Sequence, residues 1–120
     1  MPIRNKMPLC CLAFLLLSSA SPRGATYRVT PDEDWFSKLS GTGLKPGDEL
    51  VLGAGCYTDR RMLQVSHRGL PDKAITIRGE MGAVIRRPDA RQNTINLVGA
   101  RHVILRDLEI TGGAAGIRIY

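Results

Sequence analysis

The chain has 120 residues, of which 43% are apolar, a length and composition that fit one small folded domain and exclude a disordered tail. Lysine and arginine number 17 against 11 acidic residues, which gives a formal net charge of +6. A basic chain favours an acidic partner, but charge alone does not choose among nucleic acid, an anionic membrane and an acidic polysaccharide.

Residues 1–20 are typical of a secretory signal peptide. Arg4 and Lys6 supply positive charge, an apolar core follows over 9–17, and small residues lead to a cleavage site after Ala20. The core is shorter than the roughly 20 residues that span a bilayer as a helix. We therefore expect a secreted or periplasmic chain with no stable membrane span after signal cleavage.

Cleavage would remove Cys10 and Cys11 and leave Cys56 as the single cysteine, which excludes an intramolecular disulfide. No histidine or acid stands at the spacing that a cysteine nucleophile needs, so we predict that Cys56 is a small buried apolar residue. His67 and His102 are isolated in the sequence, and we interpret both as structural residues rather than metal ligands.

The segment 21–44 is expected to form a short strand and a capping helix. A Thr-x-x-Glu capping box begins at Thr30, so the sequence predicts a helix over about 31–40. This helix would present an aromatic and aliphatic face made of Trp35, Phe36 and Leu39.

Residues 45–120 contain short runs in which apolar and polar residues alternate, separated by turns rich in Pro, Gly and Asp. Such alternation predicts short strands. The predicted strands are 50–52, 63–65, 75–77, 84–85, 95–97, 103–105, 108–110 and 117–119.

An internal repeat suggests how these strands are arranged. The same apolar-polar-apolar triplet begins at residues 75, 95 and 117, as expected for a coil of roughly 20–25 residues in a parallel β-helix. We predict that 75–77, 95–97 and 117–119 stack in parallel in sequential rungs. Their outer residues would be buried, namely Ile75, Ile77, Ile95, Leu97, Ile117 and Ile119.

Four segments resemble the start of right-handed parallel β-helix proteins of the pectate-lyase-like class. They are Pro-Gly-Asp-Glu-Leu-Val-Leu at 46–52, Gly-Cys-Tyr-Thr at 55–58, Ile-Thr-Ile-Arg-Gly at 75–79 and the coil at 103–112. The resemblance covers essentially all of 27–120. It implies an all-β fold, a right-handed parallel β-helix whose open end is covered by a short N-terminal helix.

The class usually has more coils, and no capping segment follows the last triplet. We therefore expect a β-helix that is truncated after about three to four coils and incomplete at the C-terminus. Its exposed last rung would be an unpaired edge that could self-associate.

The middle residue of each triplet is expected to face solvent. This places Thr76, Asn96 and Arg118 in one ladder, with a second ladder through Arg78 beside it. We take Arg78, Asn96 and Arg118 as candidate substrate-binding residues, because a planar guanidinium pairs well with the carboxylate of a uronate. A solvated strand face without a ligand is the alternative interpretation.

No catalytic residue is assigned, because no position matches an active-site motif of the class. Its members often use calcium, which needs six to eight oxygen ligands, and acidic pairs such as Asp48/Glu49 and Asp107/Glu109 do not supply them. No metal site is predicted, and calcium is implied only for a longer relative. Basic pairs at 60–61 and 86–87 lack interleaved aromatic residues, so we expect no nucleic-acid partner.

Three functions stay open. In the first, the chain is the N-terminal portion of a carbohydrate-active protein of lyase or epimerase type that acts on acidic polysaccharide, and this chain alone is inactive. In the second, it is a non-catalytic glycan-binding or surface scaffold β-helix. In the third, it is a nonfunctional truncated remnant.

Overall fold

The computed structural model describes residues 24–120, so the predicted signal peptide at 1–20 lies outside the described residues. The described chain is mostly β. In chain order its elements are β1 (Thr26–Val29), α2 (Trp35–Leu39), β2 (Glu49–Leu52), β3 (Gly55–Tyr57), β4 (Gln64–Val65), β5 (Ile75–Gly79), β6 (Ala83–Arg87), β7 (Ile95–Leu97), β8 (Val103–Arg106), β9 (Glu109–Gly112) and β10 (Ile117–Ile119). No helix among these residues is long and apolar enough to cross a membrane.

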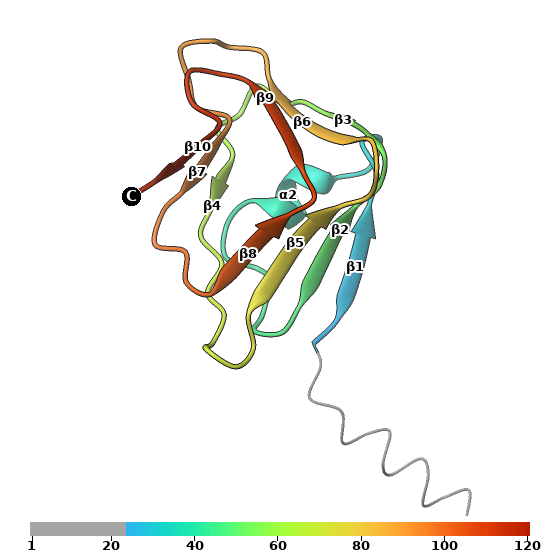
Figure 1. Ribbon diagram of the computed structural model, residues 1–120, viewed down its shortest axis with the longest axis vertical. Coiled ribbons are helices and arrows are strands. Elements are labelled where there is room, and N and C mark those ends of the chain that lie inside the picture. Colours follow the sequence, from blue (N-terminus) through green and yellow to red (C-terminus); the bar gives the residue numbers. More distant parts are fainter. Residues whose placement is uncertain (1–23) are drawn as a thin grey trace, which may run out of the picture.

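The strands form three parallel sheets. Sheet A has the order β1-β2-β5-β8, sheet B the order β4-β7-β10, and sheet C the order β3-β6-β9. Each coil passes through sheets A, C and B in turn, so the three coils are β2-β3-β4, β5-β6-β7 and β8-β9-β10. The sheets form the sides of a triangular outline in Figure 1. The predicted parallel β-helix is confirmed as a β-solenoid of about three turns.

The interior is built from alternate residues of each strand. In β5, Ile75 and Ile77 are fully buried, whereas Thr76 and Arg78 between and after them are half-buried on the outer surface. This is the pattern of a pleated strand with one face on the core. The strands form because the period-2 alternation lets every coil add apolar side chains to one continuous interior.

The predicted stacking of the three triplets is half correct. Strand β7 pairs with β10 in register, so Ile95 lies beside Ile117 and Leu97 beside Ile119. The triplet 75–77 is not the rung before them, because β5 belongs to sheet A and pairs with β2 and β8. The same triplet occurs on sheet A at 75–77 and on sheet B at 95–97, within one coil. In the sequence these two strands therefore look like the same strand in two successive coils.

The expected burial holds for three of the four inner-coil residues, since Leu97 is only half-buried, and it fails at the last coil. Ile75 and Ile77 are 0% exposed and Ile95 is 1% exposed. Ile117 and Ile119 are 42% and 77% exposed, so the prediction that they are buried is wrong. The reason is that no described strand lies on the far side of β10.

Helix α2 packs inside the outline of the coils and closes the end that carries β1 (Figure 1). Trp35 is 6% exposed and meets the ring of Tyr57 edge-on, with 5.3 Å between the ring centroids. Trp35 shares one buried cluster with Leu50 and Leu52 of the first coil. The predicted capping role of this segment is therefore confirmed.

The helix is shorter than predicted and begins later. Asp34 is its N-cap, and the carboxylate of Asp34 accepts a hydrogen bond from Ser37 N at 3.2 Å. The expected capping box instead closes a turn ahead of the helix. Glu33 Oε1 accepts from Thr30 N at 2.8 Å, and Glu33 N donates to Thr30 O at 3.1 Å.

The prediction that Cys56 is buried is wrong, because its side chain is exposed. It lies in β3, a strand that the sequence reading missed. Alternation in β3 turns Tyr57 into the core, where it is 0% exposed, and therefore turns Cys56 outward.

Candidate functional site

Two of the three candidate residues come together on sheet B. Asn96 in β7 and Arg118 in β10 are register partners, and Gln64 in β4 is the partner of Asn96 on its other side. Gln64, Asn96 and Arg118 thus form one row across all three coils.

The third candidate lies elsewhere. Thr76 and Arg78 are on β5 in sheet A, so the expected ladder of Thr76, Asn96 and Arg118 is wrong, and Arg78 does not lie beside it. Thr76 has Glu49 and Ile104 as its register partners instead.

The row on sheet B lines a groove of about 520 Å³. We call it the sheet B groove, and its lining residues are Met62, Gln64, Arg91, Gln92, Asn93, Asn96, Val98, Ala114, Arg118 and Tyr120. The lining has four amide side chains, two guanidinium groups and one aromatic ring, and no Asp or Glu side chain. Such a surface offers many hydrogen-bond donors and a positive charge.

Some polar groups of the groove already have partners within the protein, and others do not. The expectation that Asn96 faces solvent is wrong, because this side chain is 4% exposed. Its Oδ1 accepts a hydrogen bond from Asn93 Nδ2 at 2.9 Å. Arg118 is exposed, and within residues 24–120 no carboxylate lies within ion-pair distance of it. The Arg118 guanidinium lies 5.4 Å from the centre of the Tyr120 ring. Arg118 is therefore the cation that the groove offers to a ligand.

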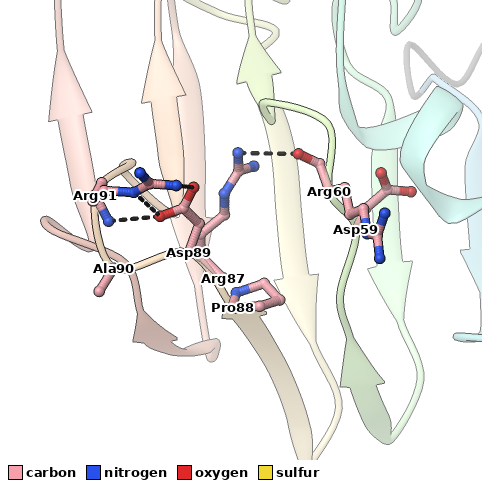
Figure 2. A pocket seen from close by; sticks show the side chains of 7 residues that line it. All are labelled: Asp59, Arg60, Arg87, Pro88, Asp89, Ala90 and Arg91. Atoms are coloured by element: carbon pink, nitrogen blue, oxygen red, sulfur yellow. Dashed lines mark hydrogen bonds and ion pairs between the residues drawn. The ribbon is translucent and has the colours of Figure 1, made fainter.

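A second groove, of about 600 Å³, lies at the corner between sheets C and B (Figure 2). We call it the corner groove. It is lined by the turn after β3, by the end of β6 and by the turn that follows β6. The lining residues are Asp59, Arg60, Arg87, Pro88, Asp89, Ala90 and Arg91. Arg91 lines both grooves.

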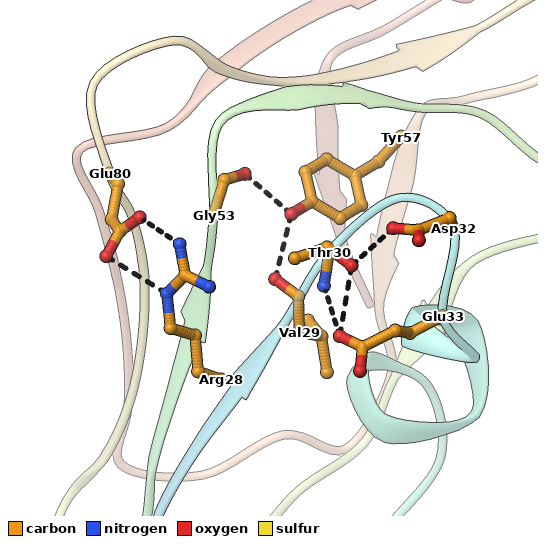
Figure 3. A network of polar contacts seen from close by, with 8 residues as sticks. All are labelled: Arg28, Val29, Thr30, Asp32, Glu33, Gly53, Tyr57 and Glu80. Atoms are coloured by element: carbon orange, nitrogen blue, oxygen red, sulfur yellow. Dashed lines mark hydrogen bonds and ion pairs between the residues drawn. The ribbon is translucent and has the colours of Figure 1, made fainter.

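The outer surface of sheet A also carries arginines, but each has its own carboxylate. Arg78 Nε donates to Glu49 Oε2 at 3.0 Å, from the neighbouring strand β2. Arg28 binds Glu80 through two hydrogen bonds, of 2.7 and 3.2 Å (Figure 3). This hydrogen bonding lowers the pKa of Glu80 below its usual value. Because Arg78 is paired with Glu49, its charge is already matched within the protein.

The contacts beside Arg28 are structural. The Tyr57 hydroxyl lies 2.6 Å from Gly53 O and 3.1 Å from Val29 O, both backbone acceptors (Figure 3). Burial raises the pKa of Tyr57 above its usual value. This side chain ties the strand before α2 to the first coil and leaves no polar group for a ligand.

The interpretation of His67 as structural is confirmed. Its Nδ1 accepts from Leu44 N at 3.2 Å, and its Nε2 donates to Leu39 O at 2.8 Å, while the ring is fully buried. Burial lowers the pKa of His67, which keeps the ring neutral and in this one tautomer. Within residues 24–120, no three His, Cys, Asp or Glu side chains are grouped closely enough to hold a metal ion.

Sequence reasoning missed two members of these sites that carried a signal. Gln64 is the middle residue of an apolar-polar-apolar triplet, the same position that Asn96 and Arg118 occupy. Arg87 follows Ala83 and Ile85 at every second position, which predicts that its side chain points inward. The alternation over 83–87 thus separates Arg87, which points inward, from Arg86, which is exposed.

No family model, curated protein or solved structure significantly matches this chain. Beyond the parallel β-solenoid, the pectate-lyase-like identity therefore stays a hypothesis.

Proposed function

We propose that the chain is the N-terminal portion of a secreted or periplasmic, right-handed pectate-lyase-like β-helix protein, and that its sheet B groove binds acidic polysaccharide. The observation that carries this proposal is a groove without an acidic side chain that presents Arg118, which forms no ion pair among residues 24–120. An acidic side chain in the groove would repel a polyuronate, and an internal ion pair would compete with it.

Each kind of side chain in the groove has a role in this proposal. Arg118 binds a sugar carboxylate through its planar guanidinium, which matches the two carboxylate oxygens. The exposed amide of Gln64 donates to and accepts from sugar hydroxyls. Tyr120, which is 64% exposed, offers its ring to the apolar face of a pyranose.

A non-catalytic glycan-binding scaffold is the second candidate, and one observation favours it. The sheet B groove contains no Asp, Glu, His or Lys side chain that could serve as a general acid or base near neutral pH. We expect the chain to produce no unsaturated uronates from pectate, alginate or a glycosaminoglycan, with or without calcium. An increase in ultraviolet absorbance from the purified chain would show that an active site has been overlooked.

The binding experiment is a titration of the full chain with polygalacturonate, with neutral dextran as the control polymer. Binding to polygalacturonate alone, weakening as salt is raised, is the expected result. An exposed ion pair is worth up to about 1 kcal/mol, so Arg118→Gln is expected to raise the Kd by roughly fivefold.

Arg78→Gln is the matched control, because it removes the same charge from a residue that already has Glu49 as its partner. We expect its Kd to stay close to that of the unmodified chain. Equal binding of dextran and polygalacturonate, or equal losses in the two variants, would overturn the assignment of the sheet B groove.

A further inference from the structure

The corner groove contains a buried arginine that forms no ion pair among the described residues. Arg87, the last residue of β6, points inward and is 4% exposed. Within residues 24–120 it has no carboxylate at ion-pair distance. A buried charge is costly unless it is paired, so this cation is an unusual feature of the fold.

The hydrogen bonds of Arg87 go to neutral acceptors. Its Nη1 donates to Arg61 O, and its Nη2 donates to Gln92 Oε1 and, at 3.1 Å, to Arg60 O. Its Nε is buried and has no hydrogen-bond partner. Carbonyl groups orient the guanidinium, but they do not neutralise its charge.

The acids near Arg87 are committed to other arginines. Asp59 binds Arg61 at 2.8 Å, and this hydrogen bonding lowers the pKa of Asp59 to about 2. Asp89 binds Arg91 at 3.2 Å, as Figure 2 shows. In each of these two ion pairs, the negative charge of the aspartate is balanced by the arginine that it binds.

Arg60, on the opposite wall of the corner groove, is exposed and has no ion-pair partner among the described residues. Its carbonyl group holds Arg87, so its backbone lies directly against the buried guanidinium (Figure 2). Once the paired acids are set aside, Arg60 and Arg87 leave the corner groove with excess positive charge.

We infer that the corner groove binds an oxyanion, meaning a carboxylate, sulfate or phosphate group, between Arg60 and Arg87. Arg60 supplies a mobile guanidinium at the mouth of the groove, and the buried charge of Arg87 attracts the anion from below. Charge-assisted hydrogen bonds from guanidinium to an oxyanion are among the stronger ones in proteins. This site is separate from the row of Gln64, Asn96 and Arg118, and it does not depend on polysaccharide binding there.

The test is a titration of the full chain with sodium sulfate, sodium phosphate and sodium acetate, each against sodium chloride at equal ionic strength. Nuclear magnetic resonance of arginine Nε–H groups supplies the readout at Arg87. We expect a saturable shift of the Arg87 signal with at least one oxyanion and no saturable shift with chloride. Absence of a saturable shift with all three oxyanions would overturn the inference.

Two variants distinguish anion binding at this site from a purely structural role of Arg87. Arg60→Gln keeps the backbone carbonyl that orients Arg87 and removes the exposed charge, so it is expected to weaken oxyanion binding about fivefold or more. Asp89→Asn removes a negative charge from the wall and is expected to tighten binding. Unchanged affinity in both variants would show that no anion binds between these walls.

Two further arms identify the source of the anion and keep the two proposals distinguishable. Trigalacturonate tests an oxyanion carried by a saccharide, and inorganic sulfate tests a free ion. Arg118→Gln is expected to leave the affinity for inorganic sulfate unchanged, because Arg118 does not line the corner groove. Loss of sulfate binding in Arg118→Gln would move the anion site to the sheet B groove and overturn the corner assignment.

Discussion

The two ends of the solenoid are built from similar residues but differ in packing. At the first coil, Leu50 and Leu52 are 0% exposed beneath Trp35 of α2. At the last described coil, Ile117 and Ile119 occupy equivalent inward positions of β10 but are largely exposed. Apolar residues at inward positions are therefore not sufficient for burial in a solenoid. A neighbouring rung or a cap must cover them, because each coil contacts only the next ones along the axis.

This difference affects the sheet B groove directly. Asn96 lies on β7, the central strand of sheet B, whereas Gln64 and Arg118 lie on its two edge strands, β4 and β10. The outer side of β4 is covered by backbone hydrogen bonds to Gly41, and the structure shows no such cover for β10 within residues 24–120. The groove thus combines a well-packed half with a half at the edge of the sheet.

The largest expected effect is at the cap. Trp35→Ala is expected to lower the free energy of unfolding by about 3–5 kcal/mol, because it leaves a large cavity between α2 and the first coil. Urea denaturation followed by circular dichroism measures the change. Met81→Ala is the control, since Met81 is 97% exposed and its loss should stay within about 0.5 kcal/mol. A similar small loss for Trp35→Ala would mean that α2 does not close the core.

The same substitution at two isoleucines compares a packed coil with the last one. Ile77→Ala is expected to cost about 2–5 kcal/mol, because Ile77 is 0% exposed. Ile119→Ala is expected to cost less than about 0.5 kcal/mol, because that side chain is 77% exposed. Equal costs in denaturant unfolding would contradict the difference between the two ends.

A smaller effect, dependent on pH, is expected at His67 on the packed side. Burial lowers its pKa in the folded chain, while the unfolded chain keeps a histidine pKa of about 6.5. Below about pH 6.5 the unfolded chain therefore binds a proton that the folded chain does not. Stability contributed by neutral His67 is complete above this pH and is lost as the pH falls toward the folded pKa.

Urea unfolding between pH 7.5 and 5.5 measures this dependence, with a slope of at most about 1.4 kcal/mol per pH unit for one proton. His67→Gln is expected to reduce the slope, and His102→Gln, which alters an exposed ring, serves as the control. An unchanged slope in His67→Gln would assign the pH dependence to other groups.

The sequence predicts the parallel solenoid and its cap because both depend on local patterns. Alternation marks all eight expected strands closely, and the apolar face of the segment 35–39 marks the cap. The pairing of strands between coils is harder to predict from the sequence, because the triplets on sheets A and B look alike. Residue 64 pairs with 96 and 96 with 118, so coil length varies and a fixed period misplaces the triplet 75–77.

Prediction of the candidate site is limited by the same uncertainty about which strands pair. Asn96 and Arg118 could be predicted as neighbours, since they share the middle position of triplets that do stack. Arg78 looked equivalent to Arg118 in the sequence. Its pairing with Glu49 depends on the register between β2 and β5, which no local pattern reveals. The free arginine is thus identified by its neighbours in space.

Amide hydrogen exchange of the folded chain tests the central difference between the two ends most directly. Amides of β2 and β5 are expected to exchange slowest, through global unfolding, because both strands have partners on each side. Amides of β10 are expected to exchange more than about 100-fold faster, through local opening of the last rung. Protection of residues 117–119 equal to that of β5 would contradict the account.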